Sequence, residues 1–543
     1  MRPSIFTSIC VLFLYQEPVA AQTVTLDSSN LPIVVINSSQ TIVDEPKITA
    51  DMGVIYNGPG VRNYTTDAFN NYNGKIGIEI RGNTAQDFPK KSYGFETRDA
   101  WGNNNNVPLL GMPPENDWIL YAPYSDKSLM RNVLTFKLGN DMGRYASRTQ
   151  FCELIVNGDY KGVYVLMEKI KIDPGRVAIE KLNESDLSGD PLTGGYIIKL
   201  DRNEGEAEEG WHSAYHPYID VFEGYFFVYH YPKSSKILNV QQDYIQEFMY
   251  DFETALIGPD FKDPVKGYAR YIDVESFIDF LISIELARNI DAYYISTYMY
   301  KDRDSKGGKV NMGPLWDFNL AYGNADYADG FKTDGWQYNI AYTLDGAVIP
   351  FWWCRLLQDT DFRTKLKTRW DDLRTGVLHK DSMMNYIDSL TAYLNESQQR
   401  NFVRWPVLGQ VVWPNYYIGQ TYQEEINLLK SWITDRLVWI DKNMPGDCII
   451  PAYDEEEFFI LAHPNPIGSS VNLDFWLYDP KNVTIKVYDV LGKKEEVLID
   501  GAQEAGYYSL HWNSSEVSSG VYIYQVQIDG EVLFSDKLVK LVD

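Results

Sequence analysis

The sequence predicts an α+β protein: a large domain with a strand-rich lobe and a helical lobe, followed by a small all-β sandwich. Strand patterns dominate residues 31–201, and helical periodicity dominates residues 351–443. After an acidic linker the pattern changes to short strands only. The chain has 543 residues, of which 45% are hydrophobic, so it is long enough for two or three domains with sizeable cores.

The chain is acidic, with a formal net charge of −26 at pH 7. Binding to nucleic acid or to an anionic membrane surface requires a basic footprint, so we expect neither as a partner. After the N-terminal region there is no stretch of about 18 apolar residues, and we therefore predict no transmembrane segment.

Residues 1–21 have the pattern of a signal peptide. Arg2 supplies the positive end, residues 5–15 the apolar core, and residues 19–21 a small-residue cleavage site. We expect a secreted or cell-surface protein, and the alternative is a buried N-terminal strand. Three cysteines would remain after cleavage, so at most one disulfide can form and its pairing stays open: Cys152, Cys354 and Cys448.

Two strands in the first lobe carry basic residues. Residues 75–81 alternate between apolar and polar side chains and end at Arg81, and residues 90–96 form the next strand, with Lys91 near its start. Lys90 is the fallback for Lys91, because a register slip of one residue exchanges the faces of a strand. The alternative is that these are exposed basic residues on a sheet edge.

A helix is predicted from Ser125 or Asp126 to about Met142, with Arg131 in its first turns. A hairpin then turns through Asn157-Gly158-Asp159 and ends at Glu168. By position, Glu168 belongs to the connection between lobes or pairs with Lys91. A surface salt bridge is the plainer alternative.

The centre of the chain combines a buried helix, an Asp, a hairpin and a second Asp. Residues 274–290 are apolar nearly all round and are capped by Asp273, and the helix leads to Asp291. Residues 296–301 and 309–312 form a hairpin, after which Asp317 and Asn319 follow. Because a hairpin brings its ends together, Asp291 and Asp317 can share one cleft.

Two carboxylates and an amide suit a hard divalent cation such as Mg²⁺. A phosphoryl-transfer site needs an Asp that holds the metal and another near the acceptor hydroxyl. The alternative is that Asp291 caps the helix end or the hairpin, and that Asp317 and Asn319 are turn residues.

Residues 324–338 read as a long functional loop, and helices are predicted at 351–357, 361–374, 382–400 and 422–443. Residues 446–457 form the linker, and residues 458–543 the small sandwich, with strands at 471–477, 482–488, 507–512, 520–529 and 532–542. A helical lobe after a strand-rich lobe fits a division of this domain into two lobes.

The central segment resembles the CotH kinase family of atypical secreted or surface kinases. That family carries an Asp before a Tyr-rich strand and then a Trp-Asp-x-Asp/Asn-x-x-x-Gly motif, which here read N-I-D-A-Y-Y-I-S-T-Y-M-Y-K and L-W-D-F-N-L-A-Y-G-N. The stretches R-G-N…K-K-S-Y, D-K-S-L-M-R and G-G-Y-I-I-K-L-D also match. The resemblance implies that residues 30–445 form a two-lobe atypical protein-kinase-like domain that uses ATP with Mg²⁺ or Mn²⁺.

By the same resemblance, Asp291 is the catalytic residue and Asp317 is a metal ligand. Asn319 stands where many members have a second Asp, and Ser296 where some have Asn, so one or two metal ions remain possible. Four residues are the candidates for binding the nucleotide: Arg81, Lys91, Arg131 and Glu168.

The last module is similar to the C-terminal sorting domain of the type IX secretion system of Bacteroidetes. The signatures are H-P-N-P, I-K-V-Y-D-V-L-G-K, A-G-Y-Y-S-L-H-W, S-S-G-V-Y-I-Y and K-L-V-K. The alternative is a carbohydrate-binding sandwich. If the resemblance holds, the type IX machinery is a partner, and the protein reaches the cell surface or the medium.

Together these features favour an exported atypical kinase that transfers the γ-phosphoryl group of ATP to Ser or Thr hydroxyls of a protein acceptor. The alternative is a non-catalytic kinase-like surface protein for adhesion or glycan binding, which the high Tyr and Trp content would suit. Retention of both Asp291 and Asp317 favours the kinase, because a decayed site tends to lose such acids.

Overall fold

The computed structural model describes residues 22–202, 210–215, 225–342, 349–446, 459–463, 467, 469–477, 480–504, 506–515 and 517–540. Both helices and strands are well represented, which confirms the predicted α+β class. The predicted signal peptide and nearly all of the predicted linker lie outside these residues.

The chain divides into two compact units. The first contains Met1–Met130, Thr149–Glu168 and Ile387–Leu428, and the second contains Arg131–Arg148, Lys169–Tyr386 and Leu429–Asp543. The chain therefore crosses between the units several times, and the boundary falls within two helices, α7 (Lys380–Tyr393) and α9 (Tyr422–Asn443).

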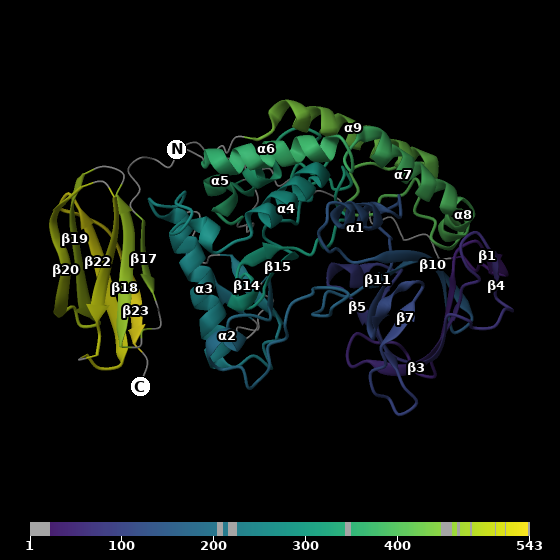
Figure 1. The fold of residues 1–543 in the computed structure, drawn as a ribbon, viewed down its shortest axis with the longest axis horizontal. Helices are drawn as coiled ribbons and strands as arrows, with labels where there is room; N and C mark the ends of the chain where they lie inside the picture. Colours follow the sequence, from purple (N-terminus) through teal and green to yellow (C-terminus); the bar gives the residue numbers. More distant parts are fainter. Residues whose placement is uncertain are drawn as a thin grey trace, which may run out of the picture. The chain divides into compact units, whose positions relative to one another are not determined.

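The first unit is built on a closed barrel (Figure 1). Neighbours around it are, in order, β10 (Thr149–Val156), β11 (Asp159–Glu168), β9 (Asp117–Tyr121), β6 (Ser92–Arg98), β5 (Tyr72–Arg81), β3 (Ile48–Ile55) and β2 (Ile33–Asn37). The parallel pairing of β2 with β10 closes it, and the other pairs are antiparallel. Two small pairs complete the strands of this unit: β1 (Ser28–Ser29) with β4 (Asn63–Tyr64), and β7 (Val107–Leu109) with β8 (Met112–Glu115).

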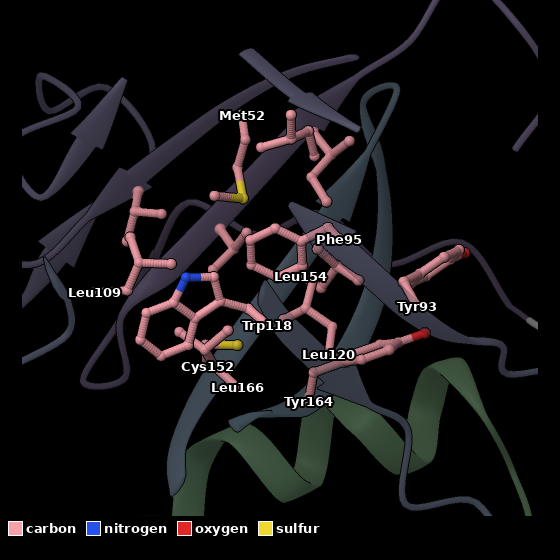
Figure 2. Close-up of a cluster of buried hydrophobic side chains, with 14 of the residues drawn as sticks. Met52, Tyr93, Phe95, Leu109, Trp118, Leu120, Cys152, Leu154, Tyr164 and Leu166 are labelled. Carbon is pink, nitrogen blue, oxygen red and sulfur yellow. The ribbon is translucent and has the colours of Figure 1, made fainter. Parts of the chain in front are cut away.

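The barrel interior is filled by apolar side chains from its strands, which point toward one another in Figure 2. Trp118 is fully buried among them, beside Phe95 and Leu154. The alternation predicted for residues 75–81 is confirmed, since Ile76 and Ile78 are fully buried in this core. Close packing of this kind is the main stabilisation of the barrel.

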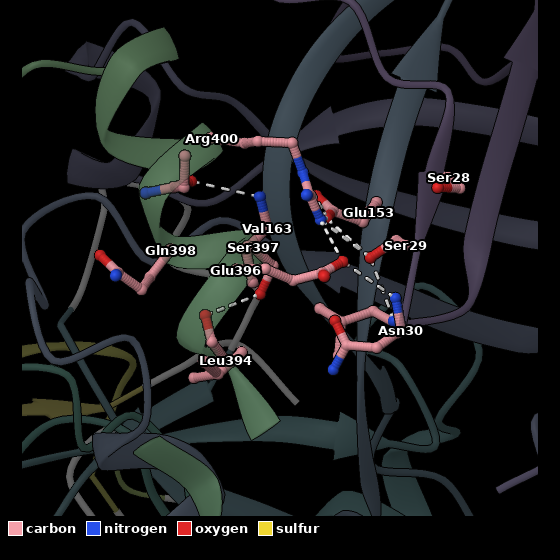
Figure 3. A network of polar contacts seen from close by, with 12 residues as sticks. Ser28, Ser29, Asn30, Glu153, Val163, Leu394, Glu396, Ser397, Gln398 and Arg400 are labelled. Atoms are coloured by element: carbon pink, nitrogen blue, oxygen red, sulfur yellow. Dashed lines mark hydrogen bonds and ion pairs between the residues drawn. The ribbon is translucent and has the colours of Figure 1, made fainter. Parts of the chain in front are cut away.

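Helix α8 (Asn395–Arg404) lies against β11 and carries the cationic half of a buried polar network (Figure 3). Arg400 contacts the fully buried carboxylate of Glu153 on β10, with Nε 3.2 Å from Oε1. Ser29 Oγ donates to the same oxygen at 2.9 Å, and Tyr160 donates to Oε2. A charge buried in a barrel wall needs such partners.

The second unit contains several helices and a five-stranded antiparallel sheet. The sheet order is β13 (Gly210–His212), β14 (Phe226–Tyr231), β12 (Tyr196–Leu200), β15 (Thr297–Lys301) and β16 (Val310–Met312). Its helices are α1 (Arg131–Asp141), α2 (Gly189–Leu192), α3 (Asn239–Ile257), α4 (Val274–Ala287), α5 (Trp352–Leu356) and α6 (Thr360–Arg374), with parts of α7 and α9.

Two sequence predictions about helices were wrong in detail. The helix predicted for 382–400 is two helices, α7 and α8, separated at Leu394. The helix predicted from Ser125 or Asp126 begins only at Arg131, because residues 126–129 form a turn in which Asp126 accepts hydrogen bonds from Ser128. A short polar side chain that bonds the nearby backbone favours such a turn over a helix.

The C-terminal region is a small two-sheet structure with its own core. One sheet is β17 (Phe459–His463), β18 (Ser470–Leu477) and β21 (Gly506–Asn513), and the other is β20 (Lys494–Gln503), β19 (Lys481–Asp489), β22 (Gly520–Ile528) and β23 (Glu531–Lys540). Trp512, Tyr524 and Ile485 are among the buried residues that the two sheets share. Sequence reasoning missed β17 and β20; the side chains of β20 are exposed or half-buried, so it lacks a clean apolar alternation.

Cys354 is disulfide-bonded, and Cys152 is a free thiol buried in the barrel core. Within the described residues no helix combines the length and the apolar character needed to cross a bilayer.

Candidate active site

Helix α4 delivers the first acidic residue of the motif. Asp273 caps its N-terminus by accepting a hydrogen bond from the Ser276 amide at 2.8 Å, as the sequence predicted. The helix ends earlier than predicted, at Ala287, because Arg288 adopts a left-handed conformation with φ 46°. Asp291 therefore lies in the turn after the helix and is half-buried.

The β15–β16 hairpin delivers the second acidic residue, as predicted. After Gly313 the chain turns back, and Asp317 has φ 61°, a left-handed conformation that is rare outside glycine. The Asn289 side chain holds this turn, since its Nδ2 donates to the main-chain oxygen of Asp317 at 3.0 Å. The two acidic residues are thereby brought together from opposite ends of the hairpin.

The proximity of the two carboxylates is visible in the electrostatics of Asp291. Burial raises the pKa of Asp291 to about 7, and repulsion by the Asp317 carboxylate adds to the shift. The positive charge of Arg202 and a hydrogen bond from Tyr327 act against it. Asp291 also contributes to raising the pKa of the neighbouring Tyr294, after burial, to about 12.

Several residues around the motif have a left-handed backbone conformation, with positive φ. Of the eleven non-glycine residues with positive φ in the described part of the chain, seven lie between 288 and 329: Arg288, Tyr293, Ser296, Asp317, Tyr322, Ala328 and Asp329. Such conformations cost free energy and persist only where the surroundings impose them, and they cluster at functional sites.

Arg131 and Asn319 belong to the same region. Arg131, the first residue of α1, is fully buried, and its Nε donates to the Ala321 main-chain oxygen at 2.9 Å. The next residue, Asn132, accepts a hydrogen bond from the Phe318 amide at 2.7 Å. Asn319 is half-buried, and its main-chain oxygen accepts from the Asn324 side chain. Helix α1 thus supports the backbone that carries Asp317 and Asn319.

The remaining predicted site residues lie in the first unit. Arg81 is the last residue of β5 and pairs with Ser92 of β6. Lys91 precedes β6, and its ammonium group donates to the Gln86 carbonyl. Glu168 is the last residue of β11, is fully buried, and lies opposite Trp118 on β9.

Lys90 and Lys91, the two alternatives for a phosphate-binding lysine, have different surroundings in the structure. Lys90 is 2% exposed and donates to the Val163 carbonyl at 2.6 Å and to Asn401 Oδ1 at 2.9 Å. Burial lowers the pKa of Lys90 to about 7. Lys90 therefore connects the barrel with α8, and Lys91, which is only half-buried, remains the candidate for binding a phosphate.

Sequence reasoning missed three residues that shape the loop after the motif. Glu285 on α4 and Arg436 on α9 form a fully buried ion pair at 3.2 Å. Glu285 accepts from the amides of Gln337 and Tyr338 and from the Tyr293 hydroxyl, and Arg436 donates to the carbonyls of Thr333 and Gly335.

Arg288 adds hydrogen bonds from the helix end to the same loop, at the carbonyls of Asp329, Asp334 and Gly335. The loop predicted at 324–338 is thus held by side chains that bond its main chain. The available signal in the sequence was a charged residue, Glu285, in the second half of a largely apolar helix that also carries Glu275 and Asp279 in its first half.

The donor set fits a hard divalent cation in one respect. Two adjacent carboxylates repel each other, and a cation between them relieves that repulsion. No group of three or more His, Cys, Asp or Glu side chains in the described residues is arranged to hold a metal. A cation at Asp317 would therefore take its other ligands from amide, carbonyl, phosphate or water oxygens.

Comparison with known proteins gives two family matches. A family model described as CotH kinase protein matches residues 78–440, and one described as a secretion system C-terminal sorting domain matches residues 462–541. The inner spore coat protein H of Bacillus subtilis (strain 168) is 23% identical over 301 residues, which cover 54% of this chain and 69% of that protein.

Similarity to solved structures is slight. The twitchin kinase region from C. elegans has 10% identity and a TM-score of 0.16, covering 96% of this chain and 100% of that one. Dimeric latent PorU from Porphyromonas gingivalis has 13% identity and a TM-score of 0.14, covering 16% of this chain and 9% of that one. Scores this low carry no argument about fold or function.

Proposed function

Since the chain belongs to the CotH kinase protein family and ends in a secretion system C-terminal sorting domain, we propose that it is an exported atypical kinase. It transfers the γ-phosphoryl group of ATP to a Ser or Thr hydroxyl of a protein acceptor, with Mg²⁺ or Mn²⁺. Residues 30–445 are the kinase-like domain with two lobes, and residues 458–543 are the sorting domain.

The observation that supports the reaction is the pair Asp291 and Asp317. Two carboxylates from opposite ends of a hairpin are held close together although they repel, and a stable fold has no need of that arrangement. A phosphoryl-transfer site does need it, because one carboxylate holds the metal and the other faces the acceptor.

The roles follow from the chemistry. Asp317 with Asn319 would hold a divalent cation, which would supply positive charge toward the phosphates of the nucleotide. The acceptor hydroxyl oxygen forms a bond to the γ-phosphorus, the bond from that phosphorus to the ADP oxygen breaks, and the hydroxyl proton passes to Asp291. By the family resemblance, four further residues are proposed to bind the nucleotide: Arg81, Lys91, Arg131 and Glu168.

The test is incubation of the purified chain with labelled ATP and Mg²⁺ or Mn²⁺. Asp317→Ala should abolish metal-dependent nucleotide binding measured by calorimetry. Asp291→Asn should keep nucleotide binding and lose about 10²- to 10⁴-fold in transfer rate, because an amide cannot accept the proton. Asp326→Asn, at an exposed position of the following loop, is the matched control and should behave as wild type.

If both site variants fold and transfer phosphate as wild type does, the site assignment is wrong. If the wild-type chain neither binds nucleotide nor labels itself or added acceptors, the alternative is favoured, namely a non-catalytic surface protein for adhesion or glycan binding.

The proposed route of export has a separate test in the native host. The sorting domain indicates export to the cell surface or the medium, and the type IX machinery is the partner that fits it. A chain ending at residue 446 should then accumulate in the periplasm, whereas the full chain should cross the outer membrane. Equal amounts of both chains outside the cell would mean that residues 458–543 are a binding module.

A further inference from the structure

Only one of the two polar atoms of the Asn289 side chain makes a hydrogen bond. Asn289 is 2% exposed, and its Nδ2 donates to the main-chain oxygen of Asp317. A carbonyl oxygen can only accept, so this hydrogen bond determines which way round the amide lies. The other end, Oδ1, is buried and has no hydrogen-bond partner among the described residues.

A buried oxygen without a partner is unusual. Leaving a buried acceptor unsatisfied costs free energy, and native structures contain few such atoms. This one is placed at the motif: its amide is bonded to Asp317, and its residue stands two positions before Asp291. Neither carboxyl group of the motif makes a hydrogen bond with this oxygen.

We infer that Asn289 Oδ1 is an oxygen ligand of the divalent cation held by Asp317. Hard cations accept neutral amide oxygens together with carboxylates. A neutral ligand adds coordination without a third negative charge beside Asp291 and Asp317. The inference rests on the proposed function, and it assigns to Asn289 a role that neither the motif nor the spacing predicted.

The test measures Mn²⁺ affinity by electron paramagnetic resonance, with a non-hydrolysable ATP analogue bound to the full chain. Asn289→Leu removes both ends of the amide, and Asn289→Asp removes the Nδ2 donor but keeps an oxygen. If Oδ1 is a ligand, Asn289→Leu weakens Mn²⁺ binding by about tenfold or more, and Asn289→Asp binds as tightly as wild type or tighter.

A purely structural role for Asn289 predicts a different result. Both substitutions lose the hydrogen bond to Asp317, so both would weaken Mn²⁺ binding equally, and that outcome would overturn the inference. Asn289→Ala replaces Asn289→Leu if the larger side chain prevents folding, which circular dichroism would show.

Asn324 offers a matched control. It is 3% exposed, and its Nδ2 donates to the main-chain oxygen of Asn319 at 2.7 Å, so it supports the same backbone. Asn324→Leu and Asn324→Asp should have equal effects on Mn²⁺ affinity. Unchanged binding in Asn289→Leu would refute the inference alone, whereas a wild-type chain that binds no Mn²⁺ with the nucleotide analogue would refute the proposed function and the inference together.

Discussion

Each unit contains a buried glutamate that faces an arginine on a helix, and the two pairs have different partners. In the first unit, Glu153 and Arg400 bond other side chains, those of Ser29, Tyr160 and Glu396 (Figure 3). In the second unit, Glu285 and Arg436 bond mainly the main chain of residues 333–338.

The different partners indicate different structural roles for the Glu153–Arg400 and Glu285–Arg436 pairs. The barrel strands satisfy their own backbone groups, so Glu153 and Arg400 are available to join α8 to the barrel wall. Residues 329–336 contain neither helix nor strand and are partly buried, so their main-chain groups have no ladder or helix partners. Glu285, Arg288 and Arg436 bond the main chain of this loop and the residues after it, and thereby hold it at the end of α4, close in sequence to Asp291.

The largest effect should come from Arg436→Met. It leaves the fully buried Glu285 carboxylate without its cation, which costs about 3–5 kcal/mol in the free energy of unfolding. It also frees the carbonyl of Thr333 and leaves that of Gly335 with Arg288 alone, so limited proteolysis should cut within 329–338 faster than in wild type. Urea unfolding and mass spectrometry of the fragments measure both.

The matched control for this substitution is Lys367→Met. Lys367 forms an exposed pair with Asp371 on α6, and removing it should change stability by no more than about 0.5 kcal/mol. A loss in Arg436→Met no greater than that of the control would contradict the assigned role of the buried pair.

A smaller loss, about 2–3 kcal/mol, is expected for Arg400→Met. Arg400 is 21% exposed, and Glu153 keeps the hydroxyl donors of Ser29 and Tyr160 after the substitution. Cleavage within 329–338 should stay at the wild-type rate, because this pair makes no contact with that loop's main chain in the hydrogen bonds described. Faster cleavage there would show that the two pairs are not separate in function.

A third buried glutamate, Glu253 on α3, sharpens the comparison because its hydrogen bonds come from the neutral donors Tyr225, Ser213 and Trp352. Burial raises the pKa of Glu253 to about 7, above its ordinary value of 4.5. The folded state therefore disfavours the charged form of Glu253. The contribution of this residue to the free energy of unfolding is fully present below pH 4.5 and is lost as the pH rises through 7.

Glu253→Gln should consequently stabilise the protein at pH 8 by about 1–2 kcal/mol and have little effect at pH 4.5. The gain stays below the full shift because a carboxylate accepts hydrogen bonds more strongly than an amide. Thermal unfolding of both proteins from pH 4.5 to 8 measures it. A constant difference across that range would mean that Glu253 does not titrate there.

The smallest effect is expected for removal of the C-terminal sandwich. Residues 459–540 have their own apolar core, so a chain ending at residue 446 should unfold at nearly the same temperature as the larger transition of the full chain. Calorimetry of the two chains tests this. A shift of the larger transition by about 5 °C or more would show that the sandwich stabilises the rest.

Local features were predictable where the signal is local. The helix before Asp291 was recognised from its apolar residues and its Asp273 cap, and the hairpin from two strands around a polar turn, and both are present. The proximity of Asp291 and Asp317 followed from the same reasoning, since the ends of a hairpin must meet. These predictions needed only periodicity, capping and turn chemistry.

The sequence by itself therefore determined the α+β class, the order of the main elements and the hairpin between Asp291 and Asp317, because each depends on residues close together in the chain. Only the tertiary structure decided that β2 pairs with β10 to close the barrel, that Lys90 is buried while Lys91 is half-buried, and that Glu285 meets Arg436. These depend on contacts between distant segments: Lys90 is buried where it can donate to Asn401, and α9 carries Arg436, which pairs with Glu285. Periodicity shows that a side chain is buried, but its partner is known only once the chain has packed.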